Sequence, residues 1–211
     1  MYKNFENLTE DKKKRILDTC IEEFAKNGYE GASTNEIVKR AGISKGILFH
    51  YFGNKKSLYL YIVDYILEYA LNKFYSDSEK LSLDLFERII QTGMRKLKIA
   101  YEEPLVHELL YKTFVDTPDD LKDDVKTRYL KLYNKEVPGF FDDLDTSAFR
   151  TDIDPQKAIE VVLIFMEGLQ TKYLNQYKNQ PAEKVYVQMD KIMEEIKQYM
   201  EILKKGIVCT C

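Results

Sequence analysis

The chain has 211 residues, of which 45% are hydrophobic and 32% charged, a balance typical of a folded globular protein and not of a disordered one. Its nine glycines and five prolines are too few for a sandwich or barrel with frequent turns, so we predict an all-α fold. The net charge of −3 excludes a uniformly basic nucleic-acid coat protein, and three cysteines are too few for a disulfide framework.

The sequence carries no sign of a membrane span or of an export signal. The longest unbroken apolar run, residues 161–166, is far shorter than the ~20 residues that a spanning helix needs. The amino-terminal residues include neither the apolar segment nor the small-residue cleavage site of a secretion signal. We therefore expect a cytoplasmic protein.

Positive charge is concentrated near the amino terminus. The first 56 residues carry eleven Lys and Arg against eight Asp and Glu, whereas the rest of the chain is acidic on balance. Residues 37–63 contain no acid and five cations, namely Lys39, Arg40, Lys45, Lys55 and Lys56. Such a segment is either a solvated basic face or a surface for an acidic partner, and charge alone does not decide between them.

Four helices are predicted in the first third of the chain. Their expected N-caps are Thr9, Ser33, Ser44 and Asn54. Glu36 follows the second cap at the spacing of a capping box. Glycines should end the first helix near Gly28 and the second at Gly42, and the fourth should run to about Tyr75.

Longer helices are predicted beyond residue 80. One covers about residues 82–101, and residues 158–169 are so apolar that a helix there should be covered on all sides. Each of four prolines should lie in the first turn of a helix, because its missing N–H costs nothing there. These prolines are Pro104, Pro118, Pro155 and Pro181, and Thr117 and Asp154 are the caps expected before two of them.

The last predicted helix, about residues 183–204, carries an apolar seam with alternating spacings of four and three, as in a coiled coil. A helix with two apolar faces can pack one on its own domain and offer the other to a second subunit. We therefore expect a dimer interface formed by this helix and by the apolar segment 158–169. Its residues are Phe165, Leu169, Val185, Met189, Ile192, Ile196 and Tyr199.

The second and third predicted helices, joined by a tight turn at Gly42, form a helix-turn-helix with the first. Ile37 and Leu48 should fix the crossing of the two helices. The exposed face of the third should hold Ser44, Lys45, His50 and Tyr51. A helix of this size fits the major groove of DNA, where its amino-terminal residues meet base edges and its cations bind phosphate. The segment is therefore a candidate DNA-binding element.

Some side chains of this element have two interpretations. His50 either packs on Tyr59 or contacts DNA, and its place on the outer face of the third helix favours DNA. Phe49 and Phe52 fit the apolar core of the head better than a DNA contact, although Phe49 stays among the candidate DNA-binding residues.

The residues from Gly28 to Tyr59 follow the pattern GxxxxS/TxxEIxxxAGISKGxxF/YxYFxNKxxLY, which resembles the signature of the tetracycline-repressor (TetR) family of transcriptional regulators. The resemblance implies an Ω-shaped homodimer with a helix-turn-helix head over residues 1–54 and a helical body over residues 55–211 for ligand binding and dimerisation. It also implies a regulator, usually a repressor, that a small molecule releases from a palindromic operator. The alternative is a helical ligand-binding or adaptor protein without DNA binding.

The resemblance also assigns roles within the head. Thr34, His50, Tyr51 and Lys55 match positions that contact DNA, and Lys45 and Gly46 open the recognition helix against it. Two residues depart from the pattern, because Ile47 stands where many relatives have a polar base reader and Phe49 replaces a tyrosine. Ile47 can contact a thymine methyl, so we expect little direct base readout and more shape readout. The candidate DNA-binding residues are Thr34, Ser44, Lys45, Gly46, Ile47, Phe49, His50, Tyr51 and Lys55.

The chain has sixteen tyrosines and no tryptophan. Rings with hydroxyl tips suit a cavity for a flat or elongated, largely apolar molecule, although a ring at helical spacing can equally belong to the core. His107, with Glu103 and Tyr111 one helical turn away on either side, is either a polar group of that cavity or a metal ligand that lacks the further ligands of a zinc site. The candidate ligand-binding residues are Tyr61, Tyr65, Tyr69, Phe86, Tyr101, His107, Tyr111, Phe114, Phe165 and Tyr173.

The sequence argues against an enzyme. Neither histidine has a catalytic partner nearby in the sequence, and there is no glycine-rich phosphate loop. We predict no cofactor and no resident metal. Cys209 and Cys211 are interpreted as part of a frayed terminus, with a redox or metal clip as the alternative.

Overall fold

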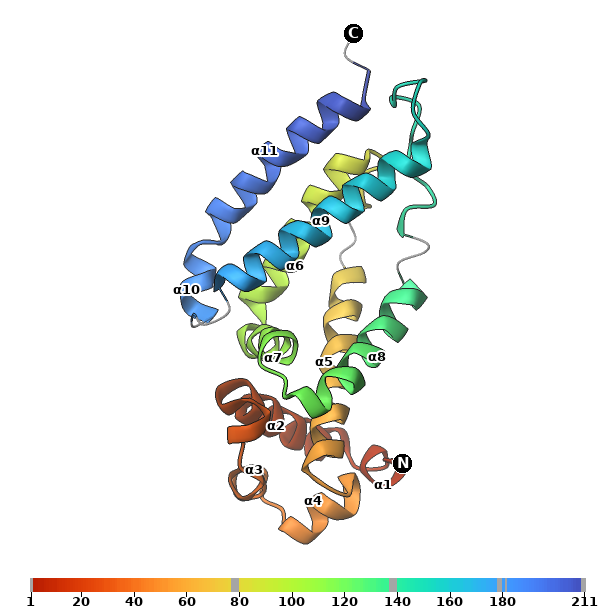
Figure 1. The fold of residues 1–211 in the computed structure, drawn as a ribbon. Helices are drawn as coiled ribbons and strands as arrows, with labels where there is room; N and C mark the ends of the chain where they lie inside the picture. The colour runs from red at the N-terminus through yellow and green to blue at the C-terminus, as the bar shows by residue number, and fades with distance from the viewer. Residues whose placement is uncertain (1, 77–79, 137–139, 178–179, 181, 210–211) are drawn as a thin grey trace. The chain divides into compact units, whose positions relative to one another are not determined.

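The structure is a computed structural model that describes residues 2–76, 80–136, 140–177, 180 and 182–209. Within these residues it contains helices and one isolated antiparallel bridge, between Phe149 and Val208, which confirms the predicted all-α class (Figure 1). The helices are α1 (Lys3–Glu6), α2 (Glu10–Gly31), α3 (Thr34–Ala41), α4 (Lys45–Phe52), α5 (Lys55–Tyr75), α6 (Leu85–Glu102), α7 (Pro104–Val115), α8 (Asp119–Glu136), α9 (Pro155–Tyr177), α10 (Ala182–Val187) and α11 (Met189–Ile207).

The chain forms two compact units. The first consists of Met1–Asp77 and Ile99–Glu136, so it holds α1 to α5, the last turn of α6, α7 and α8. The second consists of Ser78–Lys98 and Val137–Cys211, with most of α6 and the helices α9 to α11. The helices that follow the head, α5, α7 and α8, therefore pack with it in one unit.

Three of the predicted caps are confirmed in the first unit. The hydroxyl oxygen of Ser33 accepts a hydrogen bond from the Glu36 amide at 3.4 Å, and that of Ser44 accepts from the Ile47 amide at 3.2 Å. The Asn54 side chain accepts from the third residue of α5 at 2.8 Å. These bonds satisfy amide groups that the first turn of a helix leaves without partners.

The start and the end of the first long helix differ from the prediction. Thr9 precedes α2, but its side chain makes no capping hydrogen bond. Gly28 has a positive φ of 65°, but its ψ of −176° is not that of a left-handed helix stop, and one more turn continues to Gly31. The Glu23 carboxylate, which accepts from the Ser33 amide at 2.8 Å, ties this turn to the start of α3.

The core of the first unit lies between α2, α5 and α7, which pack against one another. Its fully buried side chains include Phe5, Ile16, Phe24, Ile37, Leu48, Phe52, Leu58 and Ile62. They come from all four helices of the head as well as from α5. The head therefore has no separate core, because it shares one apolar cluster with α5 and α7.

The second unit has its own core, built from Leu85, Phe86, Val162 and Met200 on α6, α9 and α11. The expectation that residues 158–169 are covered on all sides is wrong for the single chain. Ala158 and Val162 are buried, but Val161 is 51% exposed and Ile164 63% exposed. One face of α9 is thus apolar and uncovered by its own subunit.

The last helix is not continuous as predicted, because α10 ends at Val187 and α11 begins at Met189. At the break the Gln188 amide bonds to the Val185 carbonyl at 3.0 Å, three residues back, and the regular four-residue ladder resumes at Ile192. Two valines and a tyrosine precede the break, and such side chains are poor helix formers. The predicted seam therefore runs unbroken only from Met189 onward.

Two of the four prolines lie in the first turn of a helix as predicted, whereas the prediction is wrong for Pro118. Pro104 and Pro155 each start a helix, and the Asp154 side chain caps α9 by accepting from the Gln156 amide at 2.9 Å. Thr117 is not a cap, because Pro118 directly precedes α8 and the Thr117 hydroxyl donates to α7 instead. Pro181 lies outside the described residues.

The prediction of a frayed terminus is wrong for Cys209. Its amide donates to the Ala148 carbonyl at 3.0 Å, next to the bridge between Phe149 and Val208. This tie holds the chain after α11 to the segment before α9. Cys211 lies outside the described residues.

Candidate nucleic-acid interface

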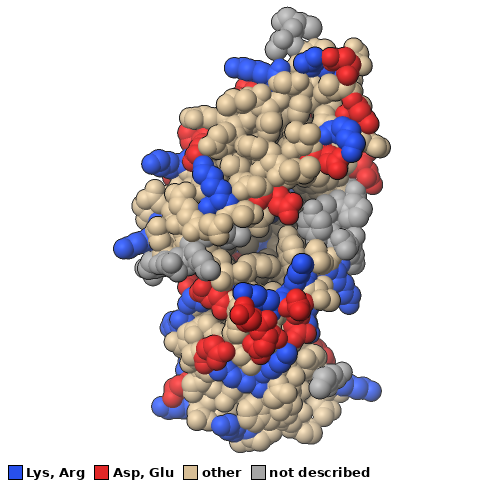
Figure 2. All heavy atoms as spheres, viewed as in Figure 1, with Lys and Arg blue, Asp and Glu red and all other residues tan. Residues whose placement is uncertain are grey.

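Helix α4 presents one face to the core of the first unit and the other to solvent. Leu48 and Phe52 are buried at 0% and 1% exposure, four residues apart on the inner face. Lys45, Gly46, Ile47 and His50 are exposed, and Phe49 and Tyr51 are partly buried. Figure 2 shows mostly uncharged surface at the lower end of the view, where α4 lies, with Lys and Arg at its margins. A helix held by its inner face in this way can enter a groove.

The cations of the basic segment are less available than the sequence suggests. Arg40 forms an ion pair with Glu22 of α2, and Lys56 pairs with Asp124 of α8 at 2.8 Å. Although residues 37–63 contain no acid, helices outside this segment supply carboxylates to two of its cations. Among the described residues, only Lys39 and Lys45 of the five cations bind neither an acid nor a backbone carbonyl.

Lys55 is partly engaged by the head itself. Its ammonium donates to the Glu30 carbonyl at 3.0 Å and lies 5.1 Å from the centre of the Tyr29 ring. A cation at the carboxyl end of a helix interacts favourably with the helix dipole, so Lys55 stabilises the end of α2. An ammonium has three donor hydrogens, so this bond does not prevent a further contact with phosphate.

The remaining candidates surround α4. Thr34 is the first residue of α3, and Ser44 caps α4 with an exposed side chain. The Lys45 ammonium lies 5.9 Å from the centre of the Phe49 ring, a cation–π contact that orients the lysine along its own helix. Phe52 belongs to the core as predicted.

His50 does not pack on Tyr59, which is buried against Phe24 and Tyr29. The His50 ring is exposed, and its Nε2 lies 3.0 Å from the Asn4 amide nitrogen. The imidazole therefore faces outward beside a second polar side chain, which the sequence analysis did not identify.

Helix α1, which carries Asn4, was not predicted. Phe5 on this helix is fully buried, with its ring centre 5.8 Å from that of Tyr51 and 4.8 Å from that of Phe52. The ring centre of Tyr2 lies 4.7 Å from that of Tyr61. A helix of four residues is too short for hydrophobic periodicity to reveal. The only usable signal is the pair of aromatic residues spaced by three.

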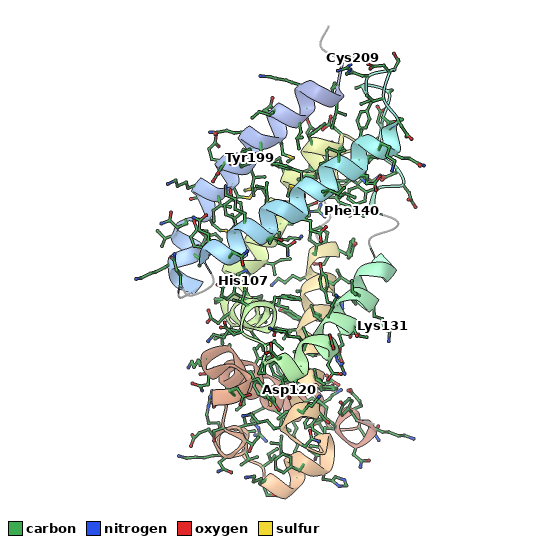
Figure 3. All side chains as sticks on the ribbon, in the orientation of Figure 1. His107, Asp120, Lys131, Phe140, Tyr199 and Cys209 are labelled. Carbon is green, nitrogen blue, oxygen red and sulfur yellow. The ribbon has the colours of Figure 1, made fainter. Side chains whose placement is uncertain are left out.

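The candidate ligand-binding residues are divided between the two units. Tyr65, Tyr69, Tyr101, His107, Tyr111 and Phe114 belong to the first unit, where Figure 3 labels His107 on α7. Tyr61 also belongs to this unit, but it packs among the rings of α1 and α4, and its hydroxyl donates to Glu6 at 2.5 Å. Phe86, Phe165 and Tyr173 belong to the second unit, in which Phe86 is part of the core.

A polar cluster links α5 to the junction of α6 and α7. The Tyr69 hydroxyl donates to the Glu103 carboxylate at 2.6 Å, and the Lys73 ammonium donates to the same oxygen at 2.7 Å. The bond from Lys73, followed by that from Tyr69, holds the pKa of the Glu103 carboxyl below its usual value. Burial lowers the pKa of His107, one turn further along α7, so its neutral form is favoured.

Helix α7 is also tied to the head. The Lys112 ammonium donates to the carbonyls of Ala25 and Lys26, the latter at 3.0 Å, just before the kink of α2 at Gly28. Sequence spacing could not reveal this contact, because it joins residues far apart in the chain. It connects the helix that carries His107 and Tyr111 to the helix that supports α3.

The candidate dimer residues all belong to the second unit and are buried or partly buried by their own chain. Leu169 and Ile192 are buried by their own chain, and Ile196 packs on its core. The ring centre of Phe165 lies 5.6 Å from that of Tyr199, which is labelled in Figure 3. The Tyr199 hydroxyl donates to Glu195 at 2.8 Å. Val185 and Met189 are partly buried.

Two further features concern the residues that the structure describes. No helix there combines the length and the apolar character that a membrane crossing requires. No group of three or more His, Cys, Asp or Glu side chains there is placed to hold a metal ion.

Comparison with known proteins identifies the family. A family model described as bacterial regulatory proteins of the tetR family matches residues 16–62, and a tetracyclin repressor-like C-terminal domain model matches residues 82–208. The chain belongs to the TetR family. TetR-family regulators bind operator DNA and effectors and act as dimers, and this chain is a DNA-binding transcriptional regulator.

Individual TetR-family proteins share only modest sequence identity with this chain. The negative regulator IcaR of the icaADBC biofilm operon in Staphylococcus aureus is 25% identical over 166 residues, which cover 74% of this chain and 81% of the relative. A TetR-family regulator from Chloroflexus aurantiacus superposes with a TM-score of 0.59 at 24% identity, over 99% of this chain and 98% of that one. The fatty acid degradation regulator FadR from Bacillus halodurans gives 0.54 at 16% identity, over 90% and 96%.

Proposed function

We propose that this TetR-family chain is a cytoplasmic repressor that binds its operator by inserting α4 into the major groove. The observation that carries the proposal is the division of α4 into a buried face, with Leu48 and Phe52, and an exposed face that begins with Lys45. The glycine after Lys45 lets the backbone approach DNA closely. Ile47, 39% exposed, is suited to a thymine methyl.

The other DNA contacts in this proposal come from around α4. Thr34 and Ser44 lie at the amino-terminal ends of α3 and α4, where hydroxyls and backbone amides suit phosphate. His50, Tyr51 and Lys55 extend the contact toward the start of α5. Among these residues only His50 carries a planar group that can both donate to and accept from base edges. We therefore propose that operator shape contributes much of the specificity.

Substitution of Lys45 by alanine tests this assignment. Loss of one phosphate contact should weaken binding to all duplex DNA and should make the slope of log K against log salt shallower by about one unit. Fluorescence anisotropy at several salt concentrations, with the DNA upstream of the chain's own gene and an unrelated duplex, measures both quantities. Lys126→Ala, at an exposed position of α8, is the matched control. An unchanged slope for Lys45→Ala would place this lysine off the DNA backbone.

We further propose that an effector binds in the first unit near Tyr65, Tyr69, His107 and Tyr111 and weakens DNA binding. Tyr69 and the head are joined by the single helix α5, and Lys112 ties α7 to α2. A ligand that displaces Tyr69 from Glu103 therefore moves helices that support α3 and α4. Two heads must fit successive major grooves about 34–36 Å apart, so a small shift disrupts the register.

The effector proposal predicts a reciprocal coupling of about 1–3 kcal/mol between ligand and DNA. Flat aromatic compounds with a few hydroxyl groups are screened for a rise in melting temperature, and each compound that binds is added at saturation to the DNA-binding assay. At least one should lower the affinity for the upstream duplex by about fivefold to hundredfold. Unchanged affinity with every bound compound would contradict the coupling.

For the dimer we propose the exposed face of α9, formed by Val161, Ile164 and Gly168. Their spacings of three and four place them on one side of the helix. A Cβ added at Gly168 would meet no atom within 4 Å, so a second subunit can approach the backbone there. Leu169 and Ile192 are covered by their own chain, so this proposal leaves them out of the interface.

A further inference from the structure

Helix α1 lies outside the part of the chain that the family model matches, which begins at residue 16. It is nevertheless joined to α4 and α5 by several contacts. Phe5 packs on Tyr51 and Phe52 of α4, and the Tyr2 hydroxyl donates to the Ser57 carbonyl of α5 at 3.3 Å. These contacts hold the outer side of α1 beside the carboxyl-terminal half of α4.

Asn4 places a polar group at the outer surface of α4. Its amide nitrogen lies 3.0 Å from His50 Nε2, and both side chains are exposed. An asparagine amide has two donor hydrogens and one acceptor oxygen, so one bond to an imidazole leaves it able to bind another group. Because Asn4 touches His50, it lies on the same exposed surface as the His50 ring.

Helix α1 also carries an exposed cation and an acid that is already hydrogen-bonded. Lys3 is exposed and directly precedes Asn4. The one acid of the helix, Glu6, is bound by the Tyr61 hydroxyl at 2.5 Å. The helix thus carries an exposed ammonium directly before the amide that touches His50, and its carboxylate accepts a hydrogen bond from α5.

We propose that α1 is a second DNA-binding element, in which Lys3 and Asn4 bind the phosphate backbone beside the groove that receives α4. This inference rests on the proposed function, because it requires α4 to face DNA. If α1 served only to support α4, its buried ring would be needed and its two polar side chains would not. The test therefore changes the polar side chains and leaves Phe5 in place.

Lys3→Gln should make the salt slope shallower by about one unit on any duplex, because one phosphate contact is lost. Asn4→Ala should weaken binding to the duplex upstream of the chain's own gene by about tenfold, as expected for a hydrogen bond to a charged group. Lys126→Gln and Asn72→Ala, exposed on α8 and α5, are matched controls that should leave both quantities unchanged. Melting temperatures of all four variants should equal that of the unaltered protein.

Hydroxyl-radical footprinting gives a second measurement. Lys3→Gln and Asn4→Ala should lose protection at one edge of each half-site and keep it where α4 binds. An unchanged salt slope, affinity and footprint in both variants would overturn the inference and leave the proposed function intact. If the unaltered protein bound neither the upstream duplex nor an unrelated one, the proposed function itself would fail, and this inference with it.

Discussion

Ile164→Glu should convert the dimer into monomers and reduce operator affinity by at least about a hundredfold. The side chain is 63% exposed on an apolar face of α9, so the substitution places a charge in the proposed seam without disturbing the subunit's own core. Two heads on one dimer bind two half-sites as a bivalent ligand, and separation of the subunits removes that advantage. Sedimentation velocity should give a mass near 24.9 kDa, and anisotropy should give the affinity loss.

The control for this variant is Gln170→Glu. It introduces the same charge at an exposed position of α9 on a different side of the helix, and it should leave the dimer intact. Ile192→Glu would be a poor test, because Ile192 is buried within its own chain and a charge there would destabilise the second unit. A dimeric Ile164→Glu protein would mean that the subunits associate through another surface.

Phe52→Ala should lower the free energy of unfolding by about 3–5 kcal/mol, the usual cost of removing a buried phenyl ring. Phe52 is 1% exposed. Its ring centre lies 4.8 Å from that of Phe5, 5.2 Å from that of Tyr61 and 5.8 Å from that of Tyr2. The cavity would loosen the contacts of α4 with both α1 and α5. Urea denaturation followed by circular dichroism measures the loss, and DNA affinity should fall in conditions where the variant is still folded.

Two further variants bracket the effect of Phe52→Ala. Phe52→Leu keeps most of the volume and should cost only about 1–2 kcal/mol. Phe114→Ala removes a ring that is 45% exposed and should cost under about 1 kcal/mol. If Phe52→Ala cost no more than Phe114→Ala, the aromatic cluster would not be what holds α4 in place.

Local chemistry made the head predictable from the sequence. The caps at Ser33, Ser44 and Asn54 and the end of a helix at Gly42 were all predicted, and the structure has each of them. Each involves atoms only three or four residues apart, so the sequence states both partners. The resemblance of residues 28–59 to the TetR signature added the biological role of the same element.

Contacts between distant residues explain what was not predicted. The sequence by itself determined most of the helices, the helix-turn-helix and the basic character of the segment around it, but neither α1 nor the break between α10 and α11. Only the tertiary structure decided that Glu22 and Asp124 neutralise two of its cations, that α1 rests on α4, and that α9 leaves Ile164 uncovered. Capping bonds form within one turn of the chain, whereas ion pairs and burial depend on which helices pack together, and that depends on the whole core.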